Sequence, residues 1–173
     1  MPYVIQSFLT ATAILIAADC SAQSRTDTMF LKMDGVEQQL NISLIDPQVI
    51  SKWEASAPEW GTMNIDGFLG EATNAELQVN LFFSVYGSGS DQRIIEPSIM
   101  ILERGTPGAW DTSDRDEDPI ITVTTYESSD AGVLVEGTFS GTPDLRSMKM
   151  ADYEKIGEIR TVSGSFSILY PAQ

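Results

Sequence analysis

Apolar and polar residues alternate through most of this chain, and the alternation restricts the fold more than any other feature. The clearest example is the run LQVNLFFSVY at residues 77–86. It places five apolar side chains on one face of an extended strand: Leu77, Val79, Leu81, Phe83 and Val85. A period of two residues is typical of a β-strand that buries one face. The sequence therefore predicts a fold built mainly from strands.

Similar runs recur along the chain and are separated by turn signals. Asp34-Gly35 separates two of them and suits the positive φ angles of a tight hairpin turn. Pro97 lies inside the run RIIEPSIMILE and predicts an edge position or a bulge, because proline cannot donate to the ladder. We count about eight strands with no alternating helices. This pattern predicts an all-β fold, an antiparallel β-sandwich or closed barrel with at most one or two short helices.

One stretch, IDPQVISKWEASAPEW at residues 45–60, breaks the period of two. Asp46 can cap a helix, Pro47 suits its first turn, and apolar residues follow at helical spacing. We expect one short helix or turn here, ending before Pro58.

Two runs near the C-terminus share a Gly-x-Phe-Ser motif, at residues 137–140 and 164–167. In each run the phenylalanine is in phase with its apolar neighbours, so we expect Phe139 and Phe166 to point into the core. The two runs are predicted to pair as adjacent antiparallel strands, with residues 143–158 connecting them. Gly137 and Gly164 precede the rings on the same face, where they would leave room for a large side chain on the neighbouring strand or permit a bulge.

The first residues read as an export signal. An apolar run at residues 8–18 is too short to span a bilayer and is followed by small residues, as in a secretory leader. Cleavage after Ala22 fits the small-x-small rule, although the leader carries no Lys or Arg. We expect residues 1–22 to be a signal peptide and residues 23–173 to form a single β-sandwich domain in the periplasm or outside the cell.

Cys20 leaves a second processing route open. It is the only cysteine and follows the apolar run, so a lipid could be attached there. A bacterial lipobox has Gly, Ala or Ser immediately before the cysteine, whereas Asp19 stands here. Lipid attachment at Cys20 and cleavage after Ala22 are the two alternatives, and the second leaves a mature chain without disulfides.

The chain is strongly acidic. It has 25 acidic and 10 basic residues, a net charge of −15, and loss of residues 1–22 would leave −14 because they contain one acidic and no basic residue. Such a surface repels nucleic acids and anionic headgroups. We therefore predict no nucleic-acid partner and membrane association only through the leader or a lipid anchor. A basic protein is the partner that the charge favours.

Few residues suit catalysis or metal binding. The chain has no histidine, which excludes Ser-His-Asp catalysis and His-ligated metals. Asp114, Asp116 and Asp118 resemble the opening of an EF-hand calcium loop, but Pro119 and Thr125 stand where glycine and a bidentate glutamate belong. We predict no enzymatic activity and no cofactor, with calcium at these three aspartates as the alternative to a solvated acidic loop.

The three tryptophans are the remaining candidates for ligand contact. Trp53, Trp60 and Trp110 all fall outside the strongest strand patterns, in or near predicted loops. Aromatic side chains on loops can form a sugar-binding or protein-binding surface. They can equally cover the open end of a β-sandwich core, which is the interpretation we favour.

Several motifs together resemble a family. An Asp-Gly hairpin, a central strand leading to YGSGS, the segment VTTYESSDAGVLVEGTFSGT and a final VSGSFSI are similar to uncharacterised bacterial envelope proteins, many of them lipoproteins. Members end in a G-x-F-S-G-T strand, a variable loop and a G-x-F strand. The resemblance implies an envelope β-sandwich without an assigned activity, and it supplies no catalytic residues.

Three functional hypotheses follow. The first is an exported envelope protein, with or without a lipid anchor at Cys20, that acts by binding or as a structural accessory and is not an enzyme. The second is an acidic periplasmic inhibitor or immunity-like protein that binds a basic enzyme, and the third is a carbohydrate-binding module.

Overall fold

The computed structural model describes residues 27–42, 52–57, 60–87, 92–113, 119–147 and 155–171. These residues form twelve β-strands and one short 3₁₀ helix, η1, at Ala72–Asn74. The strands are β1 (Thr28–Met33), β2 (Val36–Ile42), β3 (Lys52–Ala57), β4 (Trp60–Leu69), β5 (Leu77–Tyr86), β6 (Arg93–Glu103), β7 (Gly108–Asp111), β8 (Ile120–Ser129), β9 (Gly132–Gly141), β10 (Asp144–Ser147), β11 (Lys155–Ile159) and β12 (Val162–Pro171).

All twelve strands belong to one antiparallel sheet. Eleven follow one another in the order β11-β10-β7-β6-β5-β4-β2-β1-β12-β9-β8, and β3 pairs with β4 beside this path. The sheet is curled into a half-barrel. The prediction of an all-β, antiparallel fold is confirmed, whereas the predicted number of about eight strands is too low. Short strands such as β7 and β10, of four residues each, do not show a period of two clearly enough to be counted from sequence.

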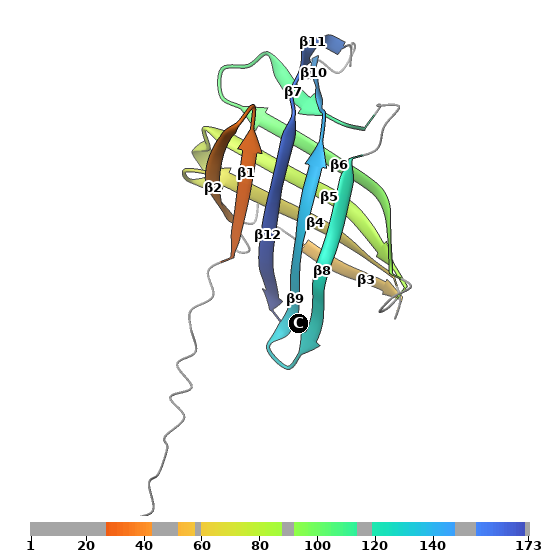
Figure 1. The fold of residues 1–173 in the computed structure, drawn as a ribbon. Coiled ribbons are helices and arrows are strands. Elements are labelled where there is room, and N and C mark those ends of the chain that lie inside the picture. The colour runs from red at the N-terminus through yellow and green to blue at the C-terminus, as the bar shows by residue number, and fades with distance from the viewer. Residues whose placement is uncertain are drawn as a thin grey trace, which may run out of the picture.

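Curling divides the sheet into two halves that face each other. We call β1, β12, β9 and β8 the front half and β4, β5 and β6 the back half, and Figure 1 shows the front strands crossing the back strands at a steep angle. Only two residue pairs, Asn41 with Phe68 and Ile42 with Gly67, join β2 to β4 at the bend. A side chain on Gly67 would start 2.8 Å from the Met29 sulfur, so the bend packs closely there.

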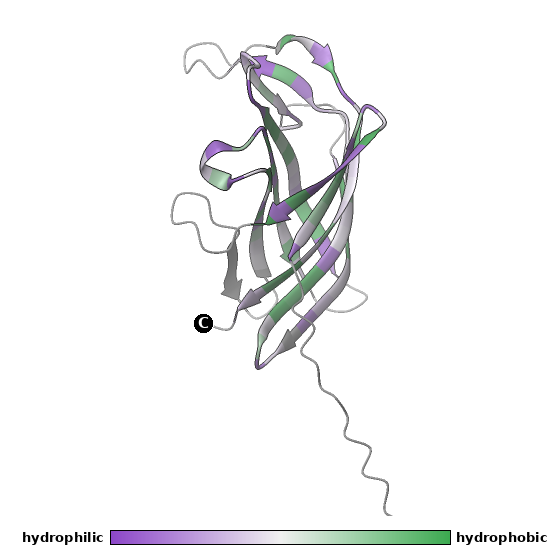
Figure 2. Ribbon diagram, turned by 90° about the vertical axis from the view of Figure 1, so that its left-hand side faces the viewer, coloured by the Kyte–Doolittle hydropathy of each residue, from purple (hydrophilic) through white to green (hydrophobic). Residues whose placement is uncertain are grey.

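The hydrophobic core lies between the two halves. The five alternate residues of β5 that the sequence indicated are all buried, as predicted, and so are Met29, Leu31, Ile99, Ile101 and Ile168. The rings of Phe83 on β5 and Phe166 on β12 connect the halves, with centroids 6.2 Å apart and planes at 43°. Figure 2 shows green, hydrophobic stretches along the strands and purple stretches at many of the turns.

The two Gly-x-Phe-Ser runs pair as the sequence predicts. In the β9–β12 ladder Phe139 lies opposite Gly164 and Phe166 lies opposite Gly137, so each ring crosses the glycine of the other strand. Both rings are buried. The predicted connection between the runs is also confirmed, although it contains two short strands, β10 and β11, and residues 148–154 lie outside the described part of the chain.

Two turn and bulge predictions are confirmed. Asp34 and Gly35 have φ angles of 51° and 88° between β1 and β2, the positive values of a tight hairpin turn. Next to Pro97 the register of β6 against β5 shifts, and Glu96 has a φ of 51°. Proline is tolerated here because a bulge interrupts the ladder with β5, and because β7 pairs with β6 only at residues 100–102, so no described strand pairs with the other side of Pro97.

The predicted helix before Pro58 is wrong for residues 52–57, which are the part of that segment that the structure describes. Residues 52–57 form β3, which pairs with β4 through Lys52 with Asn64, Trp53 with Met63 and Glu54 with Thr62. Pairing with β4 supplies backbone hydrogen bonds that the local sequence does not reveal, so tertiary context overrides the helical spacing. Residues 43–51, including Asp46 and Pro47, lie outside the described residues.

Tyr170, at the end of β12, is buried and donates a long hydrogen bond of 3.4 Å to the backbone oxygen of Asn64. Burial raises the pKa of the Tyr170 hydroxyl, and the carboxylates of Asp66 and Asp27 raise it further. The folded chain therefore binds this proton more tightly than the unfolded chain does. The resulting stabilisation is complete below the unfolded pKa of about 10 and is lost as the pH rises above it.

We predict that the free energy of unfolding falls above about pH 10 by as much as roughly 1.4 kcal/mol per pH unit through Tyr170. Tyr170→Phe should flatten this alkaline decline, as measured by urea unfolding at several pH values. Tyr126→Phe is the control, because Tyr126 is exposed on β8 and should change the decline less. An alkaline decline that is the same with and without Tyr170 would contradict the prediction.

Candidate functional site

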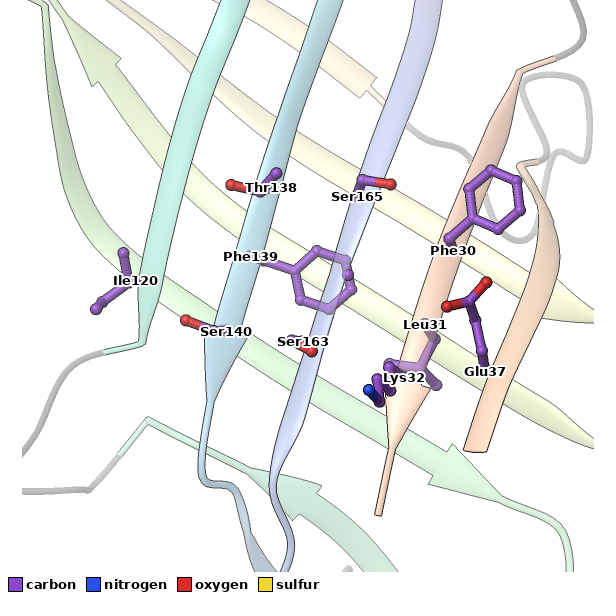
Figure 3. A pocket seen from close by; sticks show the side chains of 11 residues that line it. Phe30, Leu31, Lys32, Glu37, Ile120, Thr138, Phe139, Ser140, Ser163 and Ser165 are labelled. Atoms are coloured by element: carbon purple, nitrogen blue, oxygen red, sulfur yellow. The ribbon is translucent and has the colours of Figure 1, made fainter. Parts of the chain in front are cut away.

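A groove of about 590 Å³ lies on the outer face of the front half of the sheet. We call it the serine groove. It is lined by Phe30, Leu31, Lys32, Glu37, Ile120, Thr138, Phe139, Ser140, Ser163, Gly164 and Ser165. Figure 3 shows these side chains spread over β2, β1, β12, β9 and the start of β8. Its volume is within the range of sites that bind small ligands.

Two neighbouring rows of the sheet build the groove. In one row Phe30 lies opposite Ser165, which in turn lies opposite Thr138. In the next row Lys32 lies opposite Ser163, Ser163 opposite Ser140, and Ser140 opposite Ile120. Four hydroxyl groups therefore form the middle of the groove, with Phe30 on one side and Ile120 on the other.

The period of two explains why the serines face outward. On β12 the core-facing residues Val162, Phe166 and Ile168 are buried, so the serines between them project from the opposite face. Beneath the groove the Phe139 ring fills the space that Gly164 leaves, because a side chain on Gly164 would start 2.5 Å from that ring. The middle of the groove is therefore a closed sheet surface rather than an opening to the core.

The groove has little net charge. Its two charged residues, Lys32 on β1 and Glu37 on β2, are directly opposite each other in the ladder. The remaining polar groups are hydroxyls, which both donate and accept hydrogen bonds. Phe30 is 41% exposed and Ile120 is 66% exposed, so an aromatic and an aliphatic side chain border these hydroxyls. This arrangement can bind a neutral polar ligand that also has an apolar face.

The serines in the groove have no imidazole partner. The chain contains no histidine that could act as their general base. Ser167, two residues beyond Ser165 on β12, donates a hydrogen bond of 3.0 Å to the Glu136 carboxylate, and neither residue lines the groove. The chemistry that the site offers is hydrogen bonding and apolar contact.

The tryptophans do not form a shared surface in loops. Trp110 lies in β7 and is 1% exposed, so the hypothesis of ligand contact through Trp110 is wrong. Trp53 lies in β3 and Trp60 is the first residue of β4. All three belong to strands, because backbone pairing with neighbouring strands replaces the loops expected from weak local patterns.

Trp110 instead belongs to the hydrophobic core. The Arg160 guanidinium stacks on its ring, 4.0 Å from the centroid, and forms ion pairs of 3.3 Å with Asp34 and Glu103. Cation–π contact and two carboxylates hold this arginine against Trp110. The interpretation that the tryptophans cover an open end of the core stays a prediction.

A second polar cluster, on β4 and β5, is already saturated by its own members. The Asp66 carboxylate is 3% exposed and accepts hydrogen bonds from the side-chain amides of Gln78 at 3.1 Å, Asn80 at 2.9 Å and Asn64 at 3.3 Å. Since amide donors occupy both carboxylate oxygens, the cluster joins two strands and is not arranged to receive a ligand.

The other predicted site residues lie outside the described residues: Cys20, Asp114, Asp116 and Asp118. Lipid attachment and calcium binding therefore stay predictions. Within the part of the chain that the structure describes, no three His, Cys, Asp or Glu side chains are grouped so that they could hold a metal ion. The helices of that part include none that is long and apolar enough to cross a membrane.

The sequence does not predict the serine groove. In the VSGSFS run it predicts the phenylalanine that faces the core, and the serines in the opposite phase indicate only a polar outer face. Their alignment with Thr138 and Ser140 depends on the β9–β12 register, which the predicted pairing of the two runs does not specify.

Comparisons of this chain with protein-family models, with curated proteins and with solved structures find no match. The resemblance to bacterial envelope proteins therefore stays a prediction.

Proposed function

We propose that this chain is an exported, non-enzymatic binding protein of the bacterial envelope, and that it binds a carbohydrate chain in the serine groove. The observation that carries the proposal is the uncharged row of hydroxyls beside the exposed ring of Phe30, on a chain of net charge −15. Export is supported by the leader-like residues 1–22.

Carbohydrate is the ligand class that this chemistry fits. Sugar hydroxyls can exchange hydrogen bonds with Ser163, Ser165, Thr138 and Ser140, and the apolar face of a sugar ring can stack on Phe30. Anionic ligands such as nucleic acid would be repelled by the acidic surface. The groove is open along the sheet, which suits a chain better than a small enclosed molecule.

A binding role rather than catalysis is supported by the residues available. The groove has no imidazole or thiol and one carboxylate, Glu37, which lies opposite Lys32. Hydrolysis of a glycosidic bond normally uses two carboxyl groups on either side of that bond.

Phe30→Ala should weaken carbohydrate binding about tenfold, which corresponds to the roughly 1.4 kcal/mol expected for loss of an aromatic contact. The first measurement is retention of the protein on insoluble envelope and plant polysaccharides. Calorimetry then measures binding to soluble oligosaccharides made from the polysaccharide that retains the protein. Phe82→Ala is the matched control, because Phe82 is 38% exposed on β5, in the back half.

A double change, Ser163→Ala with Ser165→Ala, tests the hydroxyls separately from the ring. We expect it to weaken binding while the free energy of unfolding changes by less than about 1 kcal/mol, because both side chains are half-buried on the outer face of β12 and lie outside the core. Carbohydrate binding in this groove would be refuted if the unchanged chain, the Phe30→Ala variant and the double-serine variant were retained equally. It would also be refuted if no polysaccharide retained the unchanged chain.

A further inference from the structure

Among the strands that the structure describes, β8 forms one border of the sheet. β8 is the last strand in the sheet order and pairs with β9, and no other described strand pairs with its second side. In Figure 1 it borders the front half of the molecule. It approaches β6 without forming a ladder. An edge strand presents backbone N–H and C=O groups that can pair with an additional strand.

β8 lacks most of the features that normally block such pairing. It is ten residues long, which exceeds the usual strand length, and its sequence IITVTTYESS contains no proline, lysine or arginine. Ile120, Thr122 and Thr124 are exposed. The one interruption is a register shift between Val123 and Thr125, which divides the edge into two straight segments.

The described charged residues of β8 and of the turn that follows it are acidic. Residues 120–132 contain two acidic residues, Glu127 and Asp130, and no basic residue. Both are exposed, at the end of β8 and in the turn. A second copy of the chain would bring two such acidic stretches together, which like-charge repulsion opposes. A strand that carries Lys or Arg would instead be attracted to this edge.

We propose that the outer edge of β8 binds a basic, extended segment of another protein, which adds to the sheet as a further strand. Main-chain hydrogen bonds supply affinity in this mode of recognition, and the acidic surroundings select the cationic partner. This site is separate from the serine groove in its chemistry, so either proposal can fail without the other.

The test uses the full chain and a ten-residue peptide of alternating Lys and Val. Fluorescence anisotropy measures binding, and hydrogen exchange locates it. We expect the peptide to bind at low salt, to weaken with added salt and to protect amides of β8 that exchange quickly in the free protein. A peptide of alternating Glu and Val should not bind. A Lys-Val peptide with prolines in place of alternate valines should bind about tenfold more weakly, because it cannot form the ladder.

Thr122→Lys places a positive charge on β8 and should weaken binding of the Lys-Val peptide about tenfold. Thr161→Lys is the matched control, since Thr161 is also exposed but lies between β11 and β12. Thermal unfolding checks that both variants fold. The proposal is overturned if the proline peptide binds equally well, if no β8 amide gains protection, or if the two lysine variants behave alike. It is also overturned if the chain alone forms a dimer that protects β8.

Discussion

Phe139→Ala and Phe166→Ala are each expected to lower the free energy of unfolding by about 3–5 kcal/mol, a large share of the stability of a single domain. Both rings are buried, with 2% of Phe139 and 3% of Phe166 exposed. Each ring fills the space above a glycine on the neighbouring strand, so neither cavity can be closed by an adjacent side chain. Phe166 also contacts Phe83 in the back half, so its loss weakens the packing between the two halves.

Urea unfolding of each variant, followed by tryptophan fluorescence and circular dichroism, measures the change. Phe30→Ala on β1 is the control for removing a phenylalanine from the exposed face of the same half of the sheet, and it should cost about 1 kcal/mol or less. A loss under about 1 kcal/mol for both core variants would mean that the rings are not buried and that the inward and outward faces of β9 and β12 are exchanged.

Gly164→Ala should lower the free energy of unfolding by about 3 kcal/mol or more, although it adds a single methyl group. A side chain at this position would start 2.0 Å from the backbone oxygen of Phe30 and 2.5 Å from the Phe139 ring. A backbone oxygen in the middle of a ladder cannot move aside without separating β1 from β12. The clash must therefore be relieved by distorting the sheet.

Gly141→Ala is the matched control on β9. A side chain there would start 3.2 Å from Ile99 and Pro119 side-chain atoms, which can shift by a few tenths of an ångström. We expect a cost below about 1 kcal/mol for this variant. If the two alanine variants lose the same stability, the close approach of β1 and β12 at Gly164 is not what requires glycine.

Local sequence predicted the hairpins and core faces because neighbouring residues determine them. Asp34-Gly35 forms its turn from its own φ angles, and the alternation of β5 specifies which residues are buried. The pairing of β9 with β12 could be predicted across the intervening segment because each run supplies a phenylalanine and the glycine that accommodates the other ring.

The errors occurred where distant strands decide the structure. Residues 52–57 have helical spacing but form β3 because β4 provides a pairing partner. Trp110 follows a Gly/Pro-containing segment and was predicted in or near a loop, yet β7 pairs with β6 and β10 and places it under Arg160. Such long-range pairings cannot be recognised from a short window of sequence.

The sequence by itself determined that the chain forms antiparallel strands and that its surface is acidic. It also determined which faces of the strongest strands are buried. These properties depend on the order and type of the residues. The tertiary structure decided that the sheet bends between β2 and β4 into a half-barrel, that the hydroxyls of β9 and β12 align beside Phe30, and that β8 remains at the border. These features depend on strand order and register, which arise from contacts between residues far apart in the chain. Both proposed binding sites belong to this second group.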